Sequence, residues 1–486
     1  NYKPPKSLTL PADRLAAQQA GGTWSQLFDY DWLQNKYPAL GLVYWYLFIF
    51  LLGLVTYPIT RRVLPGLADK GYALSRVLGL VILAYAAWLL GSLGVPVSRG
   101  LLGIIFGAMT LVGAWQAWVQ REALASEWKS NRRMFLIVEG VFLSLFLLDL
   151  FIRLGNPDLW HPFKGGERPM DFSYFNAVIK STIFPPYDPW FAGGYINYYY
   201  YGFVLVGMPV KLLGIVPTIA YNMILPTLFA LVGTGAFTIG FNLVKRLTLN
   251  VQLLTGFAAT ALTLLLGNLG TLQMLVRSFQ RLGAPGGVVG EAGFFQRFLW
   301  GLDGFAKSLA GGTLPLGRGD WYWLPSRVIP APGDVEPITE FPLFTFLYSD
   351  LHAHMIVFML ALFMIAWGLS IVLFLRGLRT QVDTYTGIQV HTERRLLSTD
   401  HWTLITSIFF GALVLGAIYP TNTWDAYTYL PLSAIALGYA LFNAFHFKEN
   451  RFNIPPTVLR IAVALLGALT LILLAFLFYQ PYFHWW

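Results

Sequence analysis

Thr457 to Phe478 read TVLRIAVALLGALTLILLAFLF, an apolar run in which Arg460 is the charged exception. A helix needs about 20 mostly apolar residues to cross a bilayer. Nine further segments of this kind lie at residues 40–58, 78–95, 100–119, 134–153, 219–243, 251–270, 353–375, 402–419 and 428–445. The sequence therefore predicts an all-α polytopic membrane protein with about ten transmembrane helices.

The composition agrees with lipid as the main solvent of this chain. Of its 486 residues, 56% are hydrophobic and 12% are charged, whereas roughly a quarter are charged in a soluble domain. The net charge of +9 comes from short basic clusters between apolar runs, which favours a topological role over nucleic-acid binding. Disulfides, thiol catalysis and cysteine-ligated metals are excluded because there is no cysteine. The chain starts with Asn1 and ends just after an apolar run, so we expect a longer product.

The lysine and arginine positions set the predicted orientation. With ten spans and the N-terminus outside, the inner loops hold most of the basic residues, among them Arg61, Arg121, Lys245 and Arg376. The short outer loops hold few. This is the positive-inside bias of membrane proteins.

A further apolar stretch, at residues 199–216, is predicted not to cross the membrane. It is interrupted by Pro209, Lys211 and Gly214. Counting it as a span would place Lys245 outside and would invert every later loop. We therefore expect a re-entrant or interfacial helix in this stretch.

The expected domain organisation follows from this topology. It consists of an N-terminal outer segment at 1–39, a three-helix membrane section at 40–133 and a membrane core at 134–486. The core carries two long outer loops, 154–218 and 271–352, which we interpret as lacking regular structure apart from the helix expected at 199–216. Loops of this length in a compact protein are usually functional or disordered. The sequence has no P-loop, GxGxxG or HExxH motif, so chemistry driven by ATP is not expected.

Acidic and aromatic residues gather in the first outer loop. In chain order they are Glu167, Asp171, Asp188, Trp190, Asn197 and the tyrosines Tyr198 to Tyr201. Acids beside a membrane surface can act as a general base or hold a divalent cation. Two structural alternatives remain: Asp171 caps a helix that starts at Phe172, and the tyrosines form an interfacial aromatic belt.

Histidines and further acids follow on the same predicted side. Asp350, His352 and His354 lie at the start of a span, and Asp425 lies between two later spans. Histidine and carboxylate together can bind a metal or a phosphate, or relay protons. Side chains at i and i+2 of a helix diverge, so the two histidines share a ligand only where the backbone is irregular. The alternative is a polar helix end with one hydrogen-bonded histidine.

Two acids lie inside the span 134–153. Asp149 is expected to pair with Arg153, one turn later. Glu139 needs a partner that the sequence does not identify. We interpret Glu139 as structural and facing the bundle, with a place on a proton path as the alternative.

Several motifs together resemble the YYY family of multi-spanning membrane proteins, a family of unknown function named after its tyrosine run. The matching elements are Leu67–Leu74, Arg153 with Asn156-Pro157-Asp158, Glu167–Asp171, Pro185–Trp190, Tyr198–Tyr201, Ser326–Pro330, Glu340–Pro342, Asp350–His354 and Asn422–Asp425. In the family pattern, proline usually stands between the two histidines, where this chain has Ala353.

The layout is also similar to that of the C-type (GT-C) glycosyltransferases. That resemblance implies transfer of a sugar from a polyprenyl-phosphate donor at the outer face of the plasma membrane, with Mg²⁺ or Mn²⁺ as a divalent cofactor. The implied roles are catalysis for Asp171 and Glu167, substrate binding for Asp188, Trp190, Asn197, Tyr198, Arg327, Trp424 and Asp425, and metal or phosphate binding for Asp350, His352 and His354. The implied partners are membrane lipids, the lipid-linked sugar and proteins of a membrane complex, and no nucleic acid.

Two other functions are consistent with the same sequence. A transporter or flippase for a lipid-linked substrate would need polar residues across the bilayer midplane, where the spans carry few apart from Glu139. In a non-catalytic subunit of a membrane complex, the acids and histidines would be dispersed. For the enzyme, we expect one outward cleft lined by Glu167, Asp171, Asp350, His352, His354 and Asp425.

Overall fold

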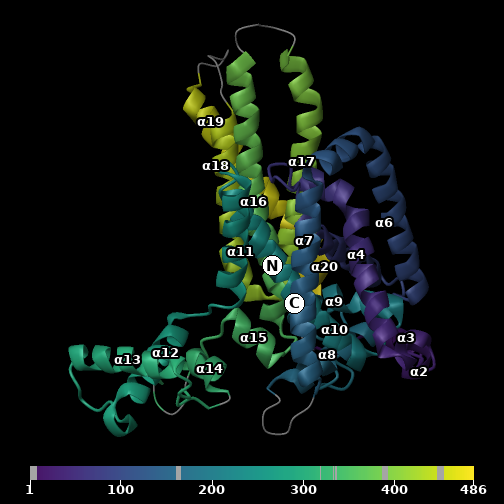
Figure 1. Ribbon diagram of the computed structural model, residues 1–486. Coiled ribbons are helices and arrows are strands. Elements are labelled where there is room, and N and C mark those ends of the chain that lie inside the picture. Colours follow the sequence, from purple (N-terminus) through teal and green to yellow (C-terminus); the bar gives the residue numbers. More distant parts are fainter. Residues whose placement is uncertain are drawn as a thin grey trace. The chain divides into compact units, whose positions relative to one another are not determined.

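A computed structural model describes residues 8–159, 166–317, 319–331, 333, 337–385, 392–445 and 454–485. Over these residues the regular structure is helical, with two isolated β-bridges (Figure 1). Eight of the described helices are long and apolar enough to cross a membrane, and a bent pair raises the number to nine. The predicted fold class, a polytopic all-α membrane protein, is confirmed, with eight or nine such helices in place of ten.

The eight long apolar helices lie in α4 (Pro38–Val63), α5 (Ser75–Ser92, preceded by η1, Tyr72–Leu74), α6 (Arg99–Val119), α7 (Arg121–Gly155), α10 (Pro217–Leu243), α16 (Ala353–Tyr385), α17 (Thr392–Thr421) and α19 (Pro456–Phe478). The bent pair is α11 (Leu249–Leu264) with α12 (Leu269–Gly283). The other helices are α1 (Ala12–Gln19), α2 (Trp24–Leu27), α3 (Leu33–Lys36), α8 (Arg168–Lys180), α9 (Tyr200–Leu213), η2 (Pro285–Gly287), α13 (Phe294–Leu309), α14 (Asp320–Trp323), η3 (Leu324–Arg327), α15 (Pro342–Tyr348), α18 (Thr423–Ala444) and α20 (Gln480–Trp485).

The chain forms two compact units. The first comprises Asn1–Ala258 and Asp350–Trp486, and the second comprises Ala259–Ser349. The first unit contains α1 to α10 and α16 to α20, and the second contains α12 to α15. The candidate site described below is built from residues of the first unit.

The helix bundle of the first unit has a basic end and an acidic end. Arg61, Lys70 and Arg121 gather where α4 and α6 end and α7 begins, and Lys245 Nζ donates to Gly66 O there at 2.9 Å. We name this the basic end. The opposite, acidic end is where α7 and α17 end and where α8, α10, α16 and α18 begin.

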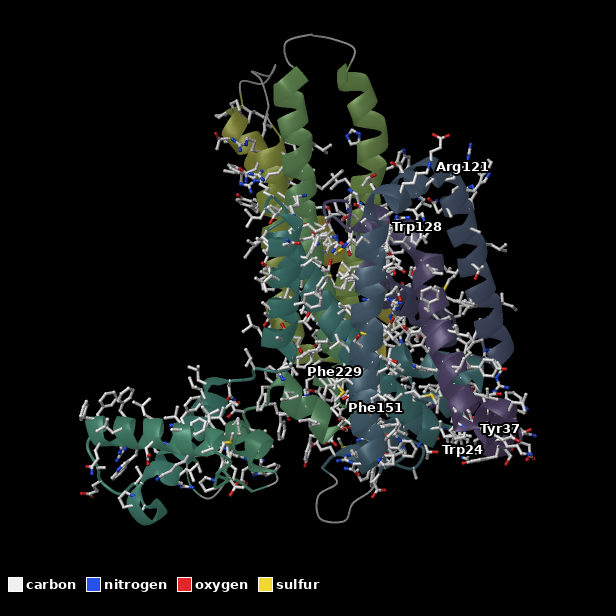
Figure 2. The ribbon with its side chains drawn as sticks, viewed as in Figure 1. Trp24, Tyr37, Arg121, Trp128, Phe151 and Phe229 are labelled. Atoms are coloured by element: carbon white, nitrogen blue, oxygen red, sulfur yellow. The ribbon has the colours of Figure 1, made fainter. Side chains whose placement is uncertain are left out.

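Exposed aromatic side chains mark both ends. Trp24 and Tyr37 lie at the acidic end and Trp128 lies at the basic end (Figure 2), and each is at least 40% exposed. Between them, α7 exposes Phe151. Aromatic belts around an apolar surface are typical of the two interfaces of a membrane protein.

Helix α9 begins and ends at the acidic end. The ring of Tyr199, just before α9, lies 5.4 Å from the ring of His352 at the start of α16. At the other terminus of α9, the Gly214 carbonyl accepts a hydrogen bond of 2.9 Å from Asn35, just before α4. This confirms the prediction that 199–216 does not cross the membrane.

Helix α18 contains the predicted span 428–445 but is not among the eight helices that meet the length and composition criteria. It nevertheless runs from one end of the bundle to the other. Its first turn holds Asp425 at the acidic end, and near its last turn the Phe442 carbonyl accepts a hydrogen bond of 2.8 Å from Arg460.

The two predicted loops contain helices, so their interpretation as structureless was wrong. Residues 154–218 include α8 in addition to α9, which was predicted, and residues 271–352 include most of α12 and all of α13 to α15. Asn268 caps α12 by accepting a hydrogen bond of 2.9 Å from a backbone amide, and Gly267 adopts a left-handed φ of 48° before it. Amphipathic helices escape a search for apolar runs because their apolar residues recur on one face.

The two acids within α7 differ in their partners. Glu139 accepts hydrogen bonds from Arg76 at 2.8 and 2.6 Å and from the Tyr72 hydroxyl at 2.7 Å. Its interpretation as structural is therefore supported by a complete set of partners. The predicted partners Asp149 and Arg153 interact through their charges, but the hydrogen bonds that Arg153 donates go to the Asn222 side chain (Nε and Nη2 at 3.0 and 2.7 Å).

Candidate functional site

Helix α8 begins one turn before Asp171. Glu167 is the N-cap residue, and Pro169 occupies the first turn, where a missing N–H leaves no helical hydrogen bond unmade. The Asp171 amide donates to the Glu167 carbonyl at 2.9 Å. Asp171 therefore lies inside the helix, and the alternative that it caps a helix starting at Phe172 is wrong.

The Asp171 carboxyl is buried without a hydrogen-bond partner. Its residue is 0% exposed, and neither oxygen is bonded to any residue that the structure describes. Burial, and to a lesser degree the negative charges of Asp350 and Glu167, raises the pKa of Asp171 from 3.8 to about 9. An unsatisfied buried polar group is costly, and strongly perturbed carboxyls are frequent at functional sites.

Glu167 and two histidines form a continuous polar contact. A Glu167 carboxylate oxygen lies 3.0 Å from His352 Nε2, and His352 Nδ1 lies 3.0 Å from His354 Nδ1. The Glu167 side chain is 61% exposed and that of His352 is 24% exposed. The histidines face each other because residues 350–352 are not helical and α16 begins only at Ala353. This is the irregular backbone that a shared histidine site requires.

Asp350 joins this segment to the start of α8. Its Oδ2 accepts a hydrogen bond of 3.0 Å from the Glu167 amide, 183 positions earlier in the chain, and its Oδ1 lies 3.3 Å from Arg168 Nε. Burial raises the pKa of Asp350 to about 6, while the Glu167 amide and Arg168 oppose the rise. The next residue is also fixed, because the Leu351 amide donates to the Tyr221 hydroxyl at 2.8 Å.

Asp425 extends the cluster from a third segment. It accepts a hydrogen bond of 2.6 Å from the Asn422 side chain, and it lies close enough to His354 for their charges to interact. The first unit thus brings together the six residues for which a shared site was predicted: Glu167, Asp171, Asp350, His352, His354 and Asp425. Their catalytic and binding roles, and a cleft between them, stay predictions.

Comparison with known proteins gives one assignment. A family model for an uncharacterized membrane protein (DUF2298) matches residues 82–486. The chain belongs to the DUF2298 family. No significant match was found among the curated proteins or among the solved structures.

Membership in DUF2298 confirms the expected multi-spanning family of unknown function. The matched range includes every residue of the candidate site but begins after the Leu67–Leu74 motif, which was one of the elements behind the resemblance. The similarity to C-type glycosyltransferases stays a prediction.

The metal or phosphate role of Asp350, His352 and His354 is also a prediction. Within the described part of this DUF2298 chain, no group of three histidine, aspartate or glutamate side chains is arranged to hold a metal ion. Asp350 is directed to Arg168 and to the Glu167 amide, and the histidines contact each other and Glu167. As these side chains stand, their donor atoms do not converge on one point.

The residues predicted to bind substrate have varied surroundings. Trp190 is 65% exposed and donates to Ser173 Oγ at 2.9 Å, which places it beside α8. Asp188 accepts a hydrogen bond of 2.8 Å from the Trp190 amide and thus stabilises the loop. Asn197 is partly buried, and Trp424 is 75% exposed.

Arg327 belongs to the second unit. Its guanidinium carbon lies 4.1 Å from the centroid of the Trp323 ring, and its Nη1 donates to Ser326 Oγ at 2.6 Å. Its predicted contact with a phosphate therefore stays a prediction.

The tyrosine run divides into exposed and buried members. Tyr198 is 38% exposed, whereas Tyr200 and Tyr201 are 2% and 0% exposed. The Trp88 indole donates to the Tyr200 hydroxyl at 2.9 Å, and the Tyr479 hydroxyl donates to that of Tyr201 at 3.2 Å. The interpretation as an interfacial belt is wrong for these two buried tyrosines, which pack α9 against the other helices.

Two residues of the site were missed in the sequence. Arg168 was visible as a basic residue between two acids, and that alternation was a usable signal. Tyr221 gave none, because a tyrosine inside an apolar span resembles any other aromatic residue of the core.

Proposed function

We propose that this chain is a membrane glycosyltransferase that transfers a sugar from a polyprenyl-phosphate donor at the acidic end of the bundle. The observation that supports this most is the contrast between two carboxyls four residues apart. Glu167 is 61% exposed and contacts His352, whereas Asp171 is buried with its pKa raised to about 9. Two carboxyls in such different environments are suited to act as base and acid in one reaction.

In the proposed reaction, Glu167 is the general base. It takes the proton of the acceptor hydroxyl while the acceptor oxygen forms a bond to the anomeric carbon of the sugar. The bond from that carbon to the phosphate oxygen breaks, and its electron pair leaves with the lipid phosphate. Once Glu167 is protonated, His352 accepts that proton at Nε2 and gives up its Nδ1 proton to His354 Nδ1, because neutral imidazole has one acceptor and one donor nitrogen.

Asp171 is the proposed acid. With a pKa of about 9 it carries its proton at neutral pH, so it can donate a hydrogen bond to the departing phosphate oxygen. A donor that acts on developing charge lowers the barrier more than it tightens substrate binding. Asp171 is fully buried. This contact therefore requires the hydrogen bond between the Glu167 amide and Asp350 to break when the substrate binds.

Two observations disfavour the alternative functions. A transporter needs free polar groups along the bundle, but Glu139 is engaged by Arg76 and Tyr72. A docking subunit does not require its acids and histidines to converge, but here three segments bring them into one cluster. The orientation predicted from the basic residues places this cluster at the outer face of the membrane.

The test is the release of polyprenyl phosphate by the purified protein in lipid nanodiscs. A panel of polyprenyl-phosphate sugars is supplied with short sugar acceptors and Mg²⁺, and the released lipid phosphate is measured by mass spectrometry. We expect wild-type protein to act on at least one donor. Replacing the base in Glu167→Gln is expected to slow release by about 10²- to 10⁴-fold.

The matched control is Glu291→Gln, which removes the same charge from an exposed position in the second unit. It is expected to keep the wild-type rate. The proposal is contradicted if folded protein releases lipid phosphate from none of the donors, or if Glu167→Gln is as fast as Glu291→Gln.

A further inference from the structure

A cavity of about 660 Å³ lies at the basic end of the first unit, away from the site described above. Its lining comes from the end of α4, the connection to η1, the junction of α6 with α7, and the facing turns of α16 and α17. This volume falls within the range of pockets that take small organic ligands, about 300–1,000 Å³.

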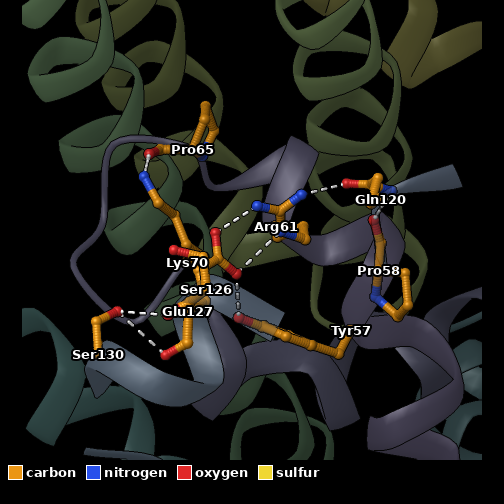
Figure 3. A network of polar contacts seen from close by, with 9 residues as sticks. All are labelled: Tyr57, Pro58, Arg61, Pro65, Lys70, Gln120, Ser126, Glu127 and Ser130. Atoms are coloured by element: carbon orange, nitrogen blue, oxygen red, sulfur yellow. Dashed lines mark hydrogen bonds and ion pairs between the residues drawn. The ribbon is translucent and has the colours of Figure 1, made fainter. Parts of the chain in front are cut away.

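One wall of this cavity is a satisfied polar network (Figure 3). Arg61 pairs with the Glu127 carboxylate through Nε, at 3.2 Å, and through Nη2, and its Nη1 donates to Gln120. The Tyr57 hydroxyl donates to the same carboxylate at 3.2 Å. The charge of Arg61 is therefore neutralised within the wall, and the network fixes its shape.

Three other cations line the cavity without a direct ion pair to a described carboxylate, although the charges of Glu127 and Asp69 act on Lys70 from a greater distance. Among the residues that the structure describes, no carboxylate lies within ion-pair distance of Arg62, Lys70 or Arg121. The acidic residue of the lining is Glu122, which is exposed. Three cations against one carboxylate leave an excess of positive charge in the lining of this open cavity.

Lys70 is held at this cavity by its backbone. Its φ of 51° is left-handed, which is uncommon for a residue other than glycine, and its Nζ donates to the Pro65 carbonyl at 2.7 Å. Burial lowers the pKa of the Lys70 ammonium. Strained backbone of this kind is often found at ligand sites, and an anion in the cavity would stabilise the charged form of Lys70.

We propose that this cavity binds the phosphate group of a phosphorylated organic ligand, contacted by Arg62, Lys70 and Arg121. A phosphate monoester carries about −1.5 to −2 charges at neutral pH, which matches the excess of cations. Arginine guanidinium groups suit phosphate oxygens because they donate in pairs. The predicted topology accounts for basic residues at this end, but it does not require them to surround a cavity. The ligand is either the headgroup of an anionic lipid or a soluble phosphate ester.

The test compares matched variants of the full chain. Arg62→Gln and Arg121→Gln remove cations that line the cavity, and Arg133→Gln removes an exposed cation further along α7, outside the lining. Binding is followed by thermal unfolding in a non-ionic detergent, with glycerol 3-phosphate as the soluble probe and short-chain phosphatidic acid as the lipid probe. Phosphatidylcholine and glycerol are the neutral controls.

We expect at least one phosphorylated probe to raise the unfolding temperature of wild-type protein. Its apparent affinity should fall about 10-fold or more in Arg62→Gln and in Arg121→Gln, because each loses a charge-assisted hydrogen bond, and should stay unchanged in Arg133→Gln. Stabilisation by glycerol 3-phosphate identifies a soluble ester as the ligand class, and stabilisation by phosphatidic acid alone identifies a lipid headgroup. No stabilisation by either probe, or equal losses in all three variants, overturns the proposal.

Discussion

Glu127 at the basic end and Asp171 at the acidic end are both shielded carboxyls, but their surroundings differ. Glu127 receives hydrogen bonds from Arg61 and from the Tyr57 hydroxyl, whereas neither oxygen of Asp171 is bonded to a described residue. A satisfied buried group stabilises the fold, while an unsatisfied one is retained at a cost and therefore needs a functional reason. The contrast separates the structural network of one end from the candidate site of the other.

The largest expected effect on the free energy of unfolding comes from removing Arg168 at the acidic end, and removing Arg61 at the basic end is the comparison. Arg168→Met leaves Asp350 buried without its counter-ion, and we expect unfolding to become easier by about 3–5 kcal/mol. Arg61→Met should cost less, about 1–2 kcal/mol, because Glu127 keeps the hydrogen bond from the Tyr57 hydroxyl and the charge interaction with Lys70. Denaturant unfolding in detergent measures both values. Equal losses would break the comparison between the two ends.

The next prediction separates activity from stability at the acidic end. In His352→Gln, a side chain that still donates to Glu167 can no longer relay a proton, so release of lipid phosphate should fall by about 10²-fold. The unfolding temperature should change little, because His352 is partly exposed. The matched variant His401→Gln, at an exposed position of α17, should keep full activity. A fully active His352→Gln protein would remove the proton relay from the mechanism.

A smaller effect is expected where the tyrosine run only packs the helices. Tyr200→Phe leaves the buried Trp88 indole without its acceptor, which should cost about 1 kcal/mol of stability. Tyr198→Phe, at the exposed start of the run, should cost no measurable stability. Differential scanning calorimetry would show the difference, and a larger loss for Tyr198→Phe would contradict this division of the run.

Much of the fold could be predicted from hydropathy and charge. The apolar runs located the eight long apolar helices together with α11 and α18. Interruptions such as Pro209 and the position of Lys245 indicated that 199–216 does not cross the membrane. The helices α12 and α13 were missed because their apolar residues lie on one face each. The span at 251–270 was expected to be continuous because a single Gly267-Asn268 pair inside an apolar run does not show that the helix ends there.

The candidate site could be located from the sequence more easily than its contacts. Topology placed Glu167, Asp350 and Asp425 on one side, and the structure brings them into one cluster. The burial of Asp171 could not be derived, because it depends on how α8 packs against α9 and against Tyr221 of α10, which come later in the chain. For the same reason the partner of Glu139, Arg76, was not identified, and neither was Asn222, which accepts the hydrogen bonds of Arg153.

The most direct test of the central claim is the pH dependence of stability and turnover in Asp171→Asn. Because the pKa of Asp171 rises from 3.8 to about 9 on folding, the native state binds more protons than the unfolded chain between these values. Asp171 therefore makes its full contribution to stability at low pH, and this contribution is lost as the pH rises towards 9. Relative to wild type, the variant should gain on the order of a few kcal/mol in stability between pH 4 and pH 9, while lipid-phosphate release falls by about 10²-fold or more. A variant that is fully active and gains no stability with rising pH would contradict the account.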